Sequence, residues 1–516
     1  MKYFIPAWYS DVSWWRDKAM PHFHRKQQSE FDDMISLLNM YKQHQSDFQV
    51  IQLNYHPDFR SFMHRNHLYE ARYWSVFDEI QGFTHMTPQP IDFTDLGWPD
   101  GTEFIYTAHY IKAIVNADKY YHVYFNQQGF LVWVESYEMD VLVRRYIFDD
   151  RGMLSSIRLF ESGEQVEIHY LSIVGDTVLI EYIESGKVVV TPEYYDSFKR
   201  NAYDCMNDLI EERFSQYVKA HLHEDDQVIV SSDARHNDII KRHTTHTKVA
   251  YSLFTKRNAM DQDISTLHIN HAKKWIVDTE FNERKLLDYK FMSGLDVDIL
   301  RITPFDANAM KSKSNEMYYN YIGIMTDDLS HDELAVMMTE IEHYLKANKH
   351  VKFMLISRSA DLYQDVLHRE MARINQYFIE QERDFEDFIA QQIIEKEKIK
   401  YKRVPFEKDL LGVINELRLI VDLSAMPDLY LQIKSIGAGI PQVNRVLTDY
   451  ITVGINGVLI DKMTDLPYAF DYYLGQLKPW NHAYTHSLQL VEKYSSKNII
   501  ESIDRFIEGD AYEGEI

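Results

Sequence analysis

The chain has 516 residues, of which 45% are hydrophobic, so it is too long for one core and long enough for about two or three domains. Its net charge of -24 excludes nucleic acid as an unselective partner, and any contact with anionic lipid needs a local basic patch. The single cysteine, Cys205, excludes an internal disulfide, and no apolar run has the length of a signal core or a membrane span. We therefore expect a cytoplasmic protein.

The N-terminal residues predict a β-α-β unit. Residues 2–7 read as a strand, apolar residues at helical spacing follow Ser29, and residues 47–55 read as the next strand. The first glycine of the chain is Gly82, so no Gly-rich phosphate-binding loop can follow the first strand. This opening is typical of a Rossmann-like domain without its nucleotide-binding loop.

A different pattern begins after a group of prolines that ends at Pro99. Apolar and polar residues alternate, and turns at Gly152, Gly163, Gly175 and Gly186 recur at the spacing of antiparallel hairpins. We expect residues 100–195 to form an extended antiparallel β-sheet domain. It is inserted into a first Rossmann-like domain made of residues 1–99 and 196–311.

From residue 196 onward, predicted strands alternate with predicted helices, which indicates a parallel sheet. Asp233 follows the strand at 227–233, and we interpret it as a helix N-cap in preference to a functional acid. His243 and His246 lie in a polar run without a third ligand pattern, which favours a solvated turn over a metal site. No metal or cofactor is expected.

The second Rossmann-like domain is expected over residues 312–490, and residues 491–516 are expected to form a C-terminal helix that returns to the first domain. Ser330 and Glu333 predict a capping box, and residues 351–357 a strand. A long charged helix is predicted next, over about 360–398. It ends in the densest positive cluster of the chain, which is either a solvated helix end or a contact for anionic lipid headgroups or an acidic partner. Its cations are Lys396, Lys398, Lys400, Lys402 and Arg403.

The stretch from Ser435 to Ile460 organises this second domain. It reads as strand, turn, helix, turn, strand, and loops at the carboxyl ends of strands are where open α/β sheets bind ligands. Residues suited to tight turns stand at both ends of the stretch: Gly437, Gly439, Pro441, Asn456 and Gly457.

This stretch resembles the donor-binding end of a GT-B glycosyltransferase, where a Gly-x-Pro loop and a later Asn-Gly bracket the sugar nucleotide. The resemblance implies an α/β, GT-B-like fold with two Rossmann-like domains. Retaining GT-B enzymes usually carry a ribose-binding Glu where this chain has Lys434, and a basic clamp for pyrophosphate where it has Asp327 and Asp328. A lysine cannot accept a hydrogen bond, and two acids repel pyrophosphate. We therefore expect a vestigial donor site with no catalytic residues, in which Lys434→Glu leaves stability close to normal.

Four N-terminal blocks resemble one particular GT-B-like family, the first and largest accessory secretory protein of the Gram-positive accessory Sec system. The blocks are YFIPAWY, EFDDMISLL, HPDFRSFMHR and RYWSVFDEIQ. The resemblance runs through most of the chain and implies a non-catalytic protein at the inner face of the cell membrane, which assists export of a glycosylated serine-rich repeat adhesin. It implies binding to two sister accessory secretory proteins and the accessory Sec motor ATPase. An active glycosyltransferase acting on the adhesin and a lectin-like module are the alternatives.

Overall fold

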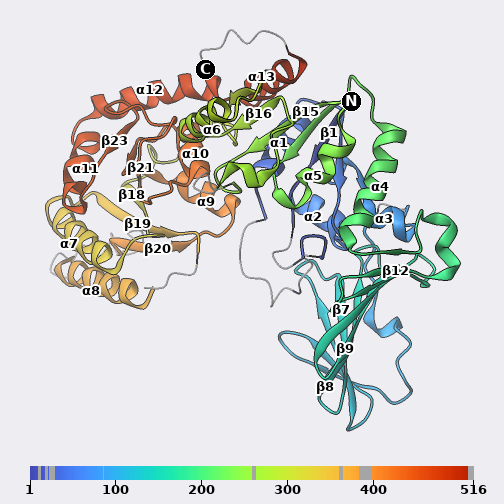
Figure 1. Ribbon diagram of the computed structural model, residues 1–516. Coiled ribbons are helices and arrows are strands. Elements are labelled where there is room, and N and C mark those ends of the chain that lie inside the picture. Colours follow the sequence, from blue (N-terminus) through green and yellow to red (C-terminus); the bar gives the residue numbers. More distant parts are fainter. Residues whose placement is uncertain are drawn as a thin grey trace.

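The computed structural model describes residues 1–9, 13–17, 21, 30–84, 87–258, 263–359, 364–382 and 397–509. These residues form a seven-stranded sheet, a ten-stranded sheet that adjoins it and a six-stranded sheet on the other side of the molecule (Figure 1). We call the seven-stranded sheet with its helices the first lobe, the ten-stranded sheet the inserted sheet, and the six-stranded sheet with its helices the second lobe. No helix among the described residues is long and apolar enough to cross a membrane.

The first lobe is built on an all-parallel sheet with the order β17-β16-β15-β14-β1-β2-β3. Its strands are β1 (Lys2–Ile5), β2 (Phe48–Gln52), β3 (Arg72–Ser75), β14 (Gln227–Ser231), β15 (Lys248–Leu253), β16 (Lys274–Val277) and β17 (Asp298–Arg301). Its helices are α1 (Asp33–Gln43), α2 (Phe59–Arg65), α3 (Val76–Gln81), α4 (Met206–His221), α5 (Ala234–His243) and α6 (Glu280–Ser293). The helix expected after Ser29 begins later, because Asp32 is its N-cap and accepts a hydrogen bond from the Ile35 amide. Asp233 caps α5, as the sequence predicts.

The inserted sheet is antiparallel throughout, and its ten strands are neighbours in chain order. It runs from Glu103 to Tyr203, so the hairpin rhythm of the glycines predicted its type correctly. The strands are β4 (Glu103–Tyr106), β5 (Ile111–Ile114), β6 (Lys119–Phe125), β7 (Leu131–Glu138), β8 (Val141–Phe148), β9 (Leu154–Glu161), β10 (Glu164–Leu171), β11 (Thr177–Tyr182), β12 (Val188–Val190) and β13 (Ala202–Tyr203).

A buried network of charges joins the inserted sheet to the first lobe. Arg60 of α2 contacts Asp150, and its Nη2 lies 2.8 Å from Asp149 Oδ2, both acids standing in the turn between β8 and β9. Arg151 of the same turn reaches back to Asp78 of α3, with 2.8 Å between Nη2 and Oδ1. Because a buried charge without its partner is strongly destabilising, this network fixes the inserted sheet to the first lobe.

The second lobe is also built on an all-parallel sheet, with the order β20-β19-β18-β21-β22-β23. Its strands are β18 (Asn320–Met325), β19 (Val351–Ser357), β20 (Ile399–Arg403), β21 (Leu417–Asp422), β22 (Gln442–Asn444) and β23 (Gly457–Leu459). Its helices are α7 (His331–Ala347), α8 (Gln364–Glu382), α9 (Glu407–Ile414), α10 (Leu429–Ala438), α11 (Leu466–Leu474) and α12 (Leu477–Lys493). The capping box of Ser330 and Glu333 opens α7 as predicted.

The last helix, α13 (Ser496–Glu508), leaves the second lobe and packs against α1 of the first. Asp504 accepts hydrogen bonds from Lys2 Nζ at 2.9 Å and from the Tyr41 hydroxyl at 2.7 Å. Ile499, Ile503 and neighbouring apolar side chains of α13 enter the core beneath α1. The C-terminal helix therefore completes the first lobe.

Candidate functional site

The stretch that the sequence presents as a ligand site begins inside a helix. Residues 429–438 form α10, whose N-cap Asp428 accepts a hydrogen bond from the Leu431 amide at 3.1 Å. The expected strand at Ser435 is therefore wrong, because Ser435 and Gly437 belong to the last turns of α10. Gly439 ends the helix with a φ of 68°, and β22 follows Pro441.

Lys434 does not face an open cleft. Its side chain is buried, and Nζ donates hydrogen bonds to the Asp306 carbonyl at 2.7 Å and to Asp306 Oδ1 at 3.0 Å. Asp306 belongs to the segment from Phe305 to Met310, between the last strand of the first lobe and the first strand of the second, which we call the linker. Lys434 stands at the position where a ribose-binding Glu was expected. Its ammonium group instead contacts Asp306 within the protein.

The first two glycines of the stretch, Gly437 and Gly439, also serve contacts within the chain. A Cβ on Gly437 would lie 2.4 Å from the Asn308 carbonyl oxygen, and the Met310 amide donates to the Gly437 carbonyl at 2.8 Å. A Cβ on Gly439 would lie 2.4 Å from Tyr484 of α12. The glycines admit the linker and an aromatic ring, so neither is needed for a bound ligand.

The loop over residues 445–456 is held by its own hydrogen bonds. Asn456 is fully buried, donates to the Tyr450 carbonyl at 2.9 Å and accepts from the Thr452 amide at 2.7 Å. A turn does lead into β23 and includes Asn456, but its positive φ, 78°, lies at Gly454 and not at Asn456 or Gly457 as expected. Gly457 is required for a different reason, because a Cβ there would lie 2.6 Å from Ile451.

The acidic loop after β18 is partly enclosed by the next loop of the sheet. Asp327 accepts hydrogen bonds from the Arg358 amide at 2.6 Å and from the Ser359 hydroxyl at 2.8 Å. Asp328 is exposed, with a φ of 63°. Arg358, which the sequence analysis missed, is a cation at the carboxyl end of β19, but its Nη2 lies 2.6 Å from Glu407 Oε1.

The loop at Asp449 and Tyr450 also contacts the first lobe. Asp449 accepts hydrogen bonds from the Glu280 amide and from Arg301 Nη1, both at 3.1 Å, and the Tyr450 hydroxyl donates to the Asp278 carbonyl at 3.3 Å. Burial raises the pKa of Asp449, and Arg301 opposes that shift. Sequence analysis missed this contact because its members are far apart in the chain.

The basic run lies on an edge strand, which corrects the expected helix end. Lys396 falls outside the described residues, and the others lie in or just before β20, paired in parallel with β19. Lys398 is buried, with Nζ 5.3 Å from the centre of the Tyr319 ring, and Lys400 is half-buried near Tyr321. Lys402 and Arg403 are exposed, so fewer cations face solvent than the sequence suggests.

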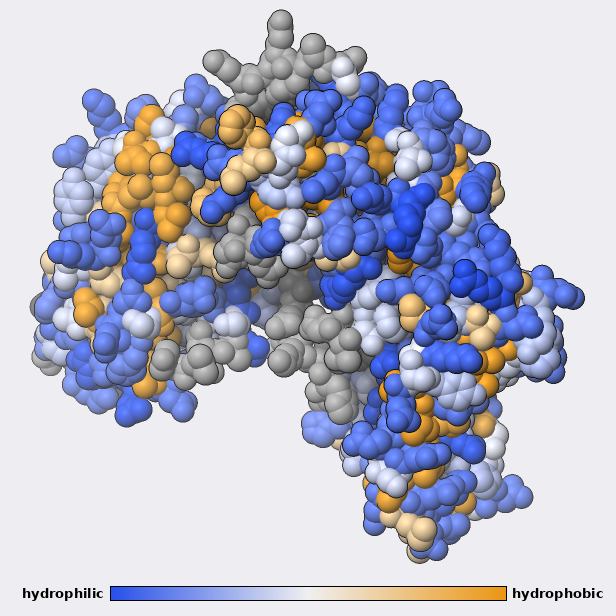
Figure 2. All heavy atoms as spheres, viewed as in Figure 1, coloured by the Kyte–Doolittle hydropathy of each residue, from blue (hydrophilic) through white to orange (hydrophobic). Residues whose placement is uncertain are grey.

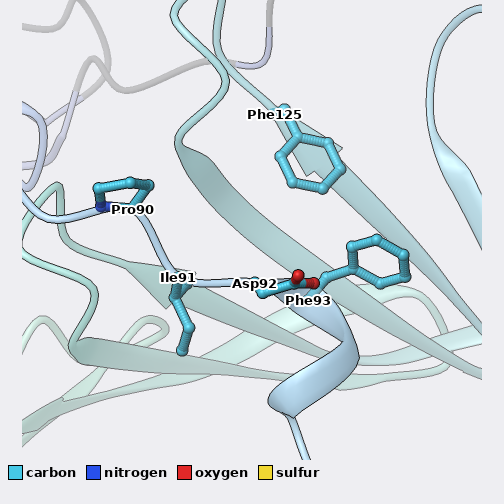
Figure 3. Close-up of a pocket in the computed structure, with 5 residues that line it drawn as sticks. All are labelled: Pro90, Ile91, Asp92, Phe93 and Phe125. Carbon is cyan, nitrogen blue, oxygen red and sulfur yellow. The ribbon is translucent and has the colours of Figure 1, made fainter.

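No metal site emerges elsewhere in the part of the chain that the structure describes. His243 Nε2 lies 2.9 Å from Glu211 Oε1, and no three potential ligands come together among the described residues. A shallow hollow of about 410 Å³ lies on the inserted sheet (Figure 3). Its one charged group is Asp92, which caps a short helix by accepting from the Thr94 amide at 2.9 Å. The hollow is lined by Pro90, Ile91, Asp92, Phe93 and Phe125.

Comparison with known proteins adds a family relationship to this geometry. The family model for accessory secretory protein 1 of the accessory Sec system matches residues 1–510. The protein of that name from Staphylococcus aureus (strain NCTC 8325) is 40% identical over 515 residues, covering 99% of both chains. That of Streptococcus gordonii is 30% identical over 525 residues, covering 98% of this chain and 99% of its own.

Solved structures agree with this relationship. A chain of the Glycosylation Associate Protein (Gap123) complex from Streptococcus agalactiae has a TM-score of 0.82 at 28% identity, covering 98% of this chain and 99% of its own. A chain of accessory secretory protein 1, 2 and 3 in Streptococcus pneumoniae has 0.84 at 26%, covering 99% of both. The pneumococcal O-GlcNAc transferase GtfA, solved with UDP and GlcNAc, has 0.70 at 12%, covering 99% of both. This last likeness shows a shared glycosyltransferase fold and nothing further.

The contacts of Lys434 reverse the expectation that Lys434→Glu is harmless. The substitution places a carboxylate against the Asp306 carboxylate and carbonyl in a buried position, so we expect a loss of about 3–5 kcal/mol in the free energy of unfolding. Urea denaturation measures this loss. Lys402→Glu, the same change at an exposed site, should shift the midpoint little. An unchanged midpoint for Lys434→Glu would show that the pair does not hold the linker.

Proposed function

The chain belongs to the accessory secretory protein 1 family of the accessory Sec system, and on this premise we propose that it acts in accessory Sec export by binding, as a catalytically silent relative of glycosyltransferases. The observation that carries the proposal is the occupation of the expected donor site by the chain itself. Lys434 binds Asp306, Gly437 admits the linker, and the loop at Asp449 contacts the first lobe. At the positions where the resemblance expects an acceptor for ribose and a cation for pyrophosphate, the chain has Lys434 and Asp327, and both are bonded within the chain.

We propose that the partners are the two sister accessory secretory proteins, the accessory motor ATPase and the glycosylated serine-rich repeat adhesin. Support for the sister proteins comes from the relatives, which were solved as a Gap123 complex and as accessory secretory protein 1, 2 and 3. We further propose a division into Rossmann-like domains at residues 1–99 with 196–311 and at 312–490. In this division residues 100–195 are an insertion, whose last strand, β13, lies beyond the proposed boundary at Ala202–Tyr203, and residues 491–516 return to the first domain.

Co-purification tests the binding role. The tagged chain, expressed with its two sister proteins at native levels, should retain both on an affinity column at physiological salt. Mass spectrometry of the eluate identifies the retained proteins, and a tagged cytoplasmic protein of similar charge serves as the control. Recovery of neither sister protein would refute the proposed role.

Nucleotide sugars should not bind. We expect no heat signal for UDP-linked hexoses at physiological concentration, because the acceptors for ribose and the cations for pyrophosphate are absent or paired within the chain. Isothermal titration calorimetry measures this directly. The pneumococcal GtfA, whose structure holds UDP and GlcNAc, is the positive control. A dissociation constant in the low micromolar range, or transfer of sugar to an acceptor, would instead favour an active glycosyltransferase.

We propose that β20 contacts anionic lipid headgroups at the inner face of the membrane. Lys402 and Arg403 are exposed at the edge of the sheet, and Lys400 is half-exposed beside them. Roughly 1 kcal/mol of attraction is available for each basic residue near an anionic surface. The structural alternative is that these charges only protect an edge strand from pairing with another chain.

Vesicle sedimentation separates these roles. Replacing Lys400, Lys402 and Arg403 with Gln should abolish sedimentation with phosphatidylglycerol vesicles, while the melting temperature changes little because exposed charges add little stability. The matched control replaces three cations of α6, Arg284, Lys285 and Lys290, with Gln, which gives the same change in net charge. Equal binding by both variants and the wild type would leave β20 with the protective role alone.

A further inference from the structure

An arginine on the outer side of the second lobe stands at an irregularity of the sheet. Between β18 and β21 the register passes from Tyr321 opposite Leu417 to Ile322 opposite Leu419, so Arg418 has no partner residue in β18. A bulge of this kind redirects the side chain of the extra residue. Here the side chain reaches α12, which forms the outer edge of the second lobe in Figure 1.

The guanidinium of Arg418 is stacked without a counter-charge. Its central carbon lies 3.4 Å from the centre of the Trp480 ring, and its Nη1 donates a hydrogen bond to Asn315. Within the described ranges no carboxylate forms an ion pair with it, and partial burial alone lowers its pKa to about 10. Burial of a cation is costly unless an anion compensates it, so among the described residues this guanidinium lacks a compensating carboxylate.

Apolar side chains flank this arginine on α12. Leu477, Tyr484 and Leu488 recur at helical spacing and are 70%, 40% and 49% exposed. Tyr484 also stacks on Trp480, with 5.7 Å between ring centres and 12° between ring planes. Figure 2 shows apolar side chains reaching the surface of the second lobe in the region of α12 and β23. Arginine, tryptophan and tyrosine are the residue types that dominate the energetics of protein interfaces.

We propose that Arg418 and the exposed face of α12 (Leu477, Tyr484 and Leu488) form the docking surface for one of the sister accessory secretory proteins. The partner contributes a carboxylate to Arg418 and apolar side chains to the flanking residues. This proposal rests on the proposed function and adds the location and chemistry of the contact. The planar guanidinium suits a bidentate carboxylate, and its stacking on Trp480 fixes its direction before binding.

A protein partner fits this surface better than a lipid surface does. One cation between exposed leucines offers little attraction to headgroups, and the net charge of -24 repels an anionic bilayer from the rest of the chain. The mixed apolar and polar character, with an aromatic stack at its centre, matches the anatomy of protein interfaces.

Affinity measurements on the full-length chain test the proposal. Arg418→Met keeps an unbranched apolar side chain beside Trp480 and removes the charge, and Leu488→Asp places a charge in the apolar face. We expect each to weaken the binding of one sister protein by roughly 30-fold or more, as at interface hot spots. The melting temperature of Arg418→Met should change little, since the variant loses the stacking on Trp480 and the hydrogen bond to Asn315 but no ion pair among the described residues, and it no longer buries a charge. Wild-type binding should also weaken with salt more steeply than the binding of Arg418→Met.

The matched controls are Arg284→Met and Leu287→Asp, the same changes at exposed positions of α6, and both should bind as the wild type does. Wild-type affinity in both Arg418→Met and Leu488→Asp would overturn the docking surface and leave the proposed function standing. Failure of the wild type to bind either sister protein would overturn both. Loss of a self-association or of vesicle binding in Arg418→Met, with sister binding intact, would assign the surface to a second copy or to lipid and refute the proposal.

Discussion

The contact between α10 and the linker is the constraint on which the arrangement of this molecule depends. Lys434 donates two hydrogen bonds to Asp306 of the linker. Because Gly437 has no side chain, the linker backbone at Asn308 can pass close to α10. Phe305 of the linker stacks with Phe31 and meets the edge of Tyr430. The position of the second lobe relative to the first is therefore set in two places. One is the buried contact between α10 and the linker, and the other is the contact between the loop at Asp449 and the first lobe.

Under the proposed binding role, this constraint takes the place that a ligand has in an enzyme of this fold. In an enzyme of this fold, a glycine-containing turn and the loop beyond it are free to approach a nucleotide. Here the ring of Tyr484 packs against the turn at Gly439. Asp449 of the next loop accepts hydrogen bonds from Arg301 and from the Glu280 amide at the start of α6. Under the proposed binding role, permanent contacts within the chain stand where an enzyme of this fold has contacts with its substrate.

Features with a local sequence signal were predictable. The N-cap Asp233, the capping box at Ser330 and Glu333, and the strand at residues 351–357 all depend on neighbours within a few positions. The role of Lys434 was not predictable, because Asp306 lies 128 residues away and no pattern links the two. The secondary structure of the basic run was predicted wrongly, although the sequence contains a pattern that indicates a strand. Lys400 and Lys402 alternate with Ile399 and Tyr401, the period of a strand, while the charged composition suggested the end of a helix.

The return of α13 to the first lobe imposes an order on biosynthesis. The core beneath α1 contains Phe4 and Leu38 from the start of the chain and Ile503 and Phe506 from its last helix. During translation the second lobe emerges and can fold while that core still lacks one wall, so apolar surface of the first lobe stays exposed until elongation is nearly complete. A truncation that removes α13 would therefore leave apolar surface of the first lobe, the part synthesised first, permanently uncovered.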